Sequence, residues 1–72
     1  MFKLYDREDN VIECEYLFTF DSDGKHFIVY LDKNEDILAS FYKLEGDKTI
    51  IYPIENDEDF DIVDKEIAKR CK

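Results

Sequence analysis

The only histidine, His26, is the first residue to consider for chemistry, because imidazole is the usual general base near neutral pH. Catalysis would need a nucleophile or an orienting partner within hydrogen-bond reach of the ring. Ser22 and Asp23 are its neighbours in sequence, but Ser22 lacks the Gly-x-Ser-x-Gly setting of a nucleophile elbow. We therefore predict a solvated histidine beside a turn and no catalytic residue, and we expect that the chain is not an enzyme.

Two groups of carboxylates are candidates for binding a divalent cation. Asp21-Ser22-Asp23-Gly24 begins like a calcium loop, but glycine stands at position four instead of six and Lys25 follows. The second group is the acidic run Glu55, Asp57, Glu58, Asp59 and Asp61. A solvated helix start is the favoured explanation of that run, since carboxylates stabilise a helix amino terminus. A weak cation sensor is thus an alternative function, while we predict no metal-binding and no cofactor-binding residue.

The cysteines, Cys14 and Cys71, lie at opposite ends of the chain and form no C-x-x-C motif. With one histidine they also lack the ligand spacing of a zinc site. Residues 1–6 show no apolar core of a signal peptide, so we expect a cytoplasmic protein with reduced thiols. Cys14 falls in an alternating apolar series and is predicted to be a small core residue.

The charge excludes several classes of partner. The 72 residues carry 19 acidic and 10 basic side chains, a net charge of −9, which opposes direct binding to nucleic acid or anionic lipid. No apolar run approaches the ~20 residues of a membrane-spanning helix. Hydrophobic residues make up 44% of the chain and aromatic residues 15%, enough for a folded core. We expect one domain over residues 1–72 that is a monomer.

Alternating and β-branched segments predict about five strands to position these residues. Between Ile12 and Phe20 every even position is apolar, which is typical of a strand with one face on a core. Asp23-Gly24 and Gly46-Asp47 predict tight hairpin turns, and Asn10 is the expected left-handed residue of an earlier turn. The expected strands cover residues 2–5, 12–20, 25–31, 37–45 and 49–52, the third with apolar groups on both faces.

The period changes after Ile54. Asn56 is predicted to cap a helix with Asp59 in the reciprocal capping position. Phe60, Val63, Ile67 and Cys71 recur at helical spacing and form the expected buried face. Short connectors favour antiparallel neighbours. The predicted fold is therefore a small α+β domain, an antiparallel meander with the carboxyl-terminal helix packed on one face.

The segments 14–23 (CEYLFTFDSD) and 53–61 (PIENDEDFD), with Ala39-Ser40-Phe41 between them, resemble the YrzB-like family of small acidic proteins. That family comes from low-GC Gram-positive bacteria and is catalogued as a domain of unknown function, DUF1292. The resemblance covers essentially the whole chain. It implies a cytoplasmic protein and provides no catalytic residues.

The function that remains is binding. The acidic surface is suited to contact with a protein that has a basic surface, because complementary charge selects partners and speeds association. An exposed sheet edge would be able to accept a strand from such a partner. Two alternatives stay open besides the cation sensor: a nucleic-acid mimic that fills a basic groove of a DNA- or RNA-handling protein, and acidity that serves only solubility.

Overall fold

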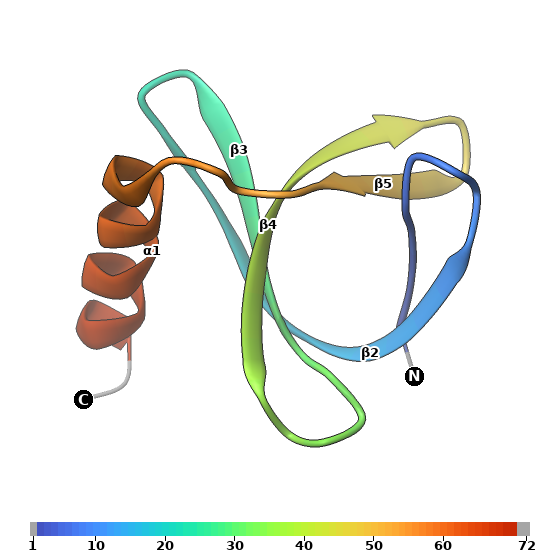
Figure 1. Cartoon of the computed structure of the whole chain (residues 1–72), viewed down its shortest axis with the longest axis horizontal. Coiled ribbons are helices and arrows are strands. Elements are labelled where there is room, and N and C mark those ends of the chain that lie inside the picture. Colours follow the sequence, from blue (N-terminus) through green and yellow to red (C-terminus); the bar gives the residue numbers. More distant parts are fainter. Residues whose placement is uncertain (1, 71–72) are drawn as a thin grey trace.

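The computed structural model describes residues 2–70 and contains five strands followed by one helix. The strands are β1 (Phe2–Tyr5), β2 (Val11–Ser22), β3 (Lys25–Leu31), β4 (Ile37–Glu45) and β5 (Lys48–Tyr52), and the helix is α1 (Asp57–Arg70). Figure 1 shows a strongly coiled sheet with α1 standing beside the β2–β3 hairpin. The predicted α+β fold, with strands first and a carboxyl-terminal helix, is confirmed.

Successive strands pair antiparallel, as the short connectors predict, and the sheet then closes into a barrel in the order β1-β2-β3-β4-β5. Closure is made by a parallel contact of β1 with β5, through the single pair Tyr5 and Ile50. The sequence did not predict this contact, because connector length constrains only strands that are neighbours in the chain.

A bulge at Leu17 divides β2 into two parts that face different cores. Tyr16 is opposite Tyr30 of β3, but Phe18 is opposite Val29, so Leu17 is the extra residue. An extra residue turns the following side chains to the other face of a strand. The prediction that all even positions from Ile12 to Phe20 share one face is therefore wrong beyond Tyr16.

The two cores lie on opposite faces of β3. Ile28 and Tyr30 point into the barrel, with a cluster that also holds Leu4, Cys14 and Ile51. Phe27 and Val29 point toward the helix, with a cluster that also holds Phe20, Ile54 and Val63. The prediction that this strand carries apolar groups on both faces is confirmed, since all four of its central residues are buried.

The turns follow local sequence with one exception. Asp23 and Gly24 have φ angles of 55° and 77°, the pair of positive values that a two-residue type I′ hairpin requires. In the turn after β1 the left-handed residue is Asp9, with φ 69°, and not the predicted Asn10. Asp6 explains the difference, because its carboxylate accepts hydrogen bonds from the backbone N–H of Glu8 and of Asn10, at 2.9 Å each.

Helix α1 buries the predicted Val63 and packs the predicted Ile67 against the core, but it exposes the predicted Phe60. Asp59 and Val63 are buried, Ile62 and Ile67 pack partly against the helix-side core, and Phe60 is 45% exposed. The prediction for Phe60 is therefore wrong, while Cys71 lies outside the described residues. No helix within residues 2–70 has the length and apolar character needed to cross a membrane.

Buried polar groups of the barrel satisfy one another. The hydroxyls of Tyr30 and Ser40 lie 3.1 Å apart, and both residues are buried. We expect Ser40→Ala to lower the free energy of unfolding by about 1–3 kcal/mol, because it leaves the tyrosine hydroxyl unpaired. The double variant Tyr30→Phe/Ser40→Ala should lose less than the sum of the single changes. Urea denaturation of all four proteins measures the coupling, and simple additivity would contradict it.

Candidate functional site

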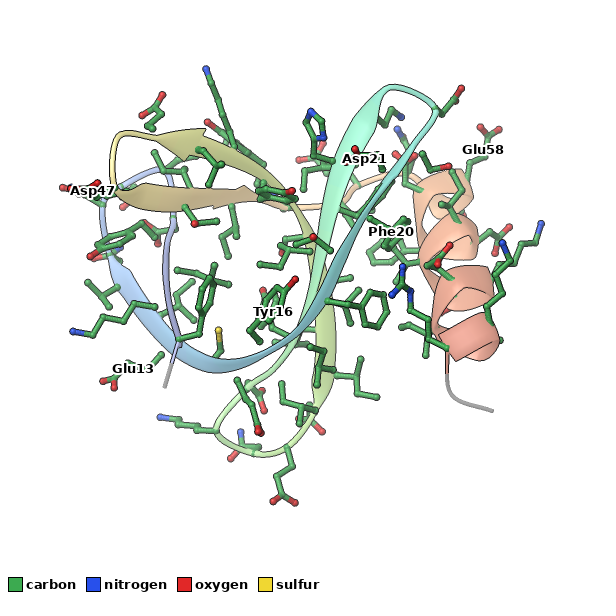
Figure 2. The ribbon with its side chains drawn as sticks, turned by 180° about the vertical axis from the view of Figure 1, so that it is seen from behind. Glu13, Tyr16, Phe20, Asp21, Asp47 and Glu58 are labelled. Atoms are coloured by element: carbon green, nitrogen blue, oxygen red, sulfur yellow. The ribbon has the colours of Figure 1, made fainter. Side chains whose placement is uncertain are left out.

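A lysine at the β2–β3 hairpin joins the two acidic segments of the sequence. The ammonium Nζ of Lys25, at the start of β3, donates to both carboxylate oxygens of Asp59, at 3.0 and 3.3 Å. The Asp59 side chain is 4% exposed and the Lys25 side chain 43% exposed. The hairpin tip and the start of α1 are thereby held against each other, and Figure 2 shows Asp21 and Glu58 at the same end of the molecule.

We name this region the acidic end, and define it by seven carboxylates from the two segments: Asp21, Asp23, Glu55, Asp57, Glu58, Asp59 and Asp61. Every one except Asp59 is exposed. Lys25 and the neighbouring His26 are the only basic side chains in the hairpin turn and helix start that bear them. The structure thus combines two groups that the sequence presented separately.

The helix start is capped differently from the prediction. The backbone carbonyl of Asn56 accepts from the N–H groups of Asp59 and Phe60, at 3.1 and 3.2 Å, so Asn56 does stand at the cap. The Asp59 carboxylate does not take the predicted reciprocal role, because it accepts from Lys25 and, at 3.4 Å, from Asn56 Nδ2. This ion pair accounts for the burial of Asp59 at the start of α1, where the sequence predicted an exposed capping residue.

His26 has a partner, although neither of the two residues considered from sequence. Its Nδ1 lies 2.6 Å from Oδ1 of Asp21, directly across the hairpin. The turn at Asp23-Gly24 already implied this register, so sequence reasoning had the signal to find the pair. Both side chains are more than half exposed, at 61% and 69%. Within residues 2–70 no hydroxyl or thiol is hydrogen-bonded to the ring, so the pair has an orienting group but no nucleophile to activate.

The carboxylates of the acidic end are gathered but do not converge. In the described part of the chain, no three His, Cys, Asp or Glu side chains are placed to hold one metal ion. The geometry therefore gives no support to the cation-sensor alternative. What the arrangement can do chemically is create a local excess of negative potential at one end of a small barrel.

Three cations outside the acidic end form ion pairs with acidic side chains of the same chain. Lys48 Nζ donates to Asp9 Oδ1 at 2.9 Å, and this hydrogen bond raises the pKa of Lys48. Lys43 pairs with Glu45, and Arg70 pairs with Glu66 while lying over the ring of Phe18. Because these cations are already neutralised by nearby acids, they do not offset the charge of the acidic end.

Cys14 occupies the barrel core as the sequence predicts. It is buried, and burial raises the pKa of its thiol, which disfavours the reactive thiolate. We expect a disulfide reagent to modify Cys14 at least ~100-fold more slowly in the folded protein than in the unfolded one.

Replacing Cys71 by serine leaves one thiol to be followed by absorbance. Leu44→Cys in a chain without Cys14 and Cys71 supplies the rate for an exposed thiol, because Leu44 is 68% exposed. Equal rates for the two positions would show that the Cys14 thiol is accessible.

The fold and the acidic end together define a class, a small acidic α+β barrel domain with one appended helix. Residues 8–72 match the family model described as a protein of unknown function, DUF1292, and the chain belongs to this family. No curated protein and no solved structure matches the chain.

Proposed function

We propose that this domain is a cytoplasmic, non-enzymatic protein-binding module whose acidic end docks onto a basic surface of a partner protein. The observation that carries the proposal is the Lys25–Asp59 contact, which brings two acidic segments 34 residues apart into one exposed surface. Charges that served only solubility would have no need to be gathered at one end.

The gathered carboxylates suit recognition better than catalysis. Charge at the rim of an interface mainly accelerates association and selects among partners, and it does so without convergent geometry. An enzyme would need a base, a nucleophile and a stabilising group within mutual reach. His26 and Asp21 supply only the first of these, in a position open to water.

The test compares two variants of equal charge. Asp57→Asn/Glu58→Gln/Asp61→Asn neutralises part of the acidic end, whereas Glu8→Gln/Glu45→Gln/Asp47→Asn removes the same charge from exposed positions elsewhere. We expect at least a tenfold loss of partner capture from cell lysate for the first variant and little loss for the second. Capture should also fall at 1 M salt, where charges are screened beyond ~3 Å.

Two results would contradict the proposal: no protein retained at any salt concentration, or equal retention by both variants. If the captured partner binds DNA, competition between DNA and this domain separates a nucleic-acid mimic from a binder of another basic surface. A mimic should displace DNA at saturation, because both would occupy the same groove.

A further inference from the structure

Strand β2 changes its partner halfway along, which leaves part of its edge open. Val11–Cys14 pair with β1, and β3 pairs only from Glu15 onward. The edge of Val11–Cys14 that faces away from β1 therefore has no strand beside it among the described residues. Two of four consecutive strand residues direct their N–H and C=O groups to each edge, so this edge offers both donors and acceptors.

An open groove runs along this edge. Residues 11–15 form one wall, and Asp32, Lys33 and Asn34 of the β3–β4 loop form the other. Figure 1 shows β2 curving away from the β3–β4 loop at this end of the barrel. Apolar surface is present, since Val11 is 53% exposed and Ile12 is only partly buried.

The loop wall is held in place by its own hydrogen bonds. Oδ1 of Asp32 accepts from the backbone N–H of Asn34 and of Asp36, at 2.8 and 3.0 Å. The backbone N–H of Asp32 donates to the Asp36 carbonyl at 3.0 Å. A wall fixed in this way needs little ordering when a ligand enters, which favours binding.

The charge of the groove identifies its occupant. Glu13 and Glu15 are exposed on β2 and Asp32 lies opposite, against the single cation Lys33. We infer that the groove accepts an extended, lysine- or arginine-bearing segment of a partner protein as an added strand on Val11–Cys14. This inference rests on the proposed function only for the class of partner, a basic protein, and adds a second docking site that lies apart from the acidic end.

The side chains of an added strand would alternate between two environments. One set shares the face of Ile12 and Cys14 and is expected to be apolar, while the other shares the face of Glu13 and Glu15 and is expected to be basic. A second copy of this chain fits poorly, because each copy has a net charge of −9.

The probe is the capped pentapeptide Lys-Val-Lys-Val-Lys, added to the full chain labelled with ¹⁵N. We expect saturable amide shifts confined to residues 11–15 and 32–34, with a dissociation constant on the order of 1 mM or tighter. Amides of Val11–Cys14 on the open edge should also exchange more slowly with solvent. The same peptide methylated at all three internal nitrogens keeps its charge but retains no internal N–H that can pair on either edge, and should bind at least tenfold more weakly.

Glu13→Gln/Glu15→Gln should weaken binding about tenfold, whereas Asp47→Asn/Asp64→Asn, which removes equal charge elsewhere, should change it less than twofold. Equal affinity for the methylated and unmethylated peptides would contradict strand addition in the groove. Amide shifts centred on Asp21–Asp23 and Asp57–Asp61 would contradict it too, and either result would leave the proposed function unaffected. Absence of saturable binding would also contradict strand addition. Shifts at the groove that depend on protein concentration without peptide would assign the edge to a second copy instead.

Discussion

Replacing Phe27 by alanine should unfold the domain or leave it barely stable. The ring is fully buried, stacks on Phe20 with centroids 4.8 Å apart, and tilts against Phe41 at 5.1 Å. Removing a buried phenylalanine side chain costs about 3–5 kcal/mol. A chain of 72 residues has a free energy of unfolding of roughly 4–11 kcal/mol, so the loss is comparable to the whole.

Far-UV circular dichroism during urea denaturation measures this effect. Phe60→Ala is the matched control, because Phe60 is 45% exposed, and its loss should lower stability by about 1 kcal/mol or less. Similar midpoints for the two variants would mean that the helix-side core is not organised around Phe27.

Replacing Leu4 by alanine should open the barrel at β1. Leu4 is the one buried residue of this four-residue strand, and it packs in the cluster with Cys14, Ile28 and Ile51. The expected loss is about 2–5 kcal/mol. Among the described residues, the strand pairing that closes the barrel between β1 and β5 consists of the single pair Tyr5 and Ile50. Loss of the Leu4 side chain therefore leaves few contacts to keep the barrel closed.

Hydrogen exchange resolves where the Leu4 variant loses structure. Amides of β1 and β5 should lose protection before those of the β2–β3 hairpin, whose core lies on the other face of the sheet. Val11→Ala provides the control, because Val11 is opposite Tyr5 on β2 but 53% exposed. Uniform loss of protection over all five strands would contradict a separate role for β1 in closure.

Most of the secondary structure was predictable because it depends on neighbours in sequence. The bounds of β3 and β4 agree with the predicted ranges, and the Asp23-Gly24 turn has the expected positive φ angles. The same turn sets the register that pairs Asp21 with His26. For the candidate site, the sequence identified both acidic segments but had no means of showing that they meet.

Two of the wrong assignments, on β2 and on α1, concern which face of an element is buried, whereas the exchange of Asn10 for Asp9 in the first turn has a local cause in Asp6. An alternating pattern does not show where a strand bulges, so the switch of faces at Leu17 was not visible in the apolar spacing. Helical spacing favoured Phe60 over Asp59, because a carboxylate is normally exposed. Burial of Asp59 becomes favourable only when the Lys25 ammonium meets it from another element.

The sequence by itself determined an acidic α+β domain of the DUF1292 family, since composition, turn residues and apolar periodicity are local properties. Tertiary structure alone decided that the sheet closes through β1 and β5 and that the net charge of −9 includes one gathered acidic end. It also decided that β2 has an open edge beside a groove. These features come from contacts between residues far apart in the chain, where local patterns hold no information about distance or register.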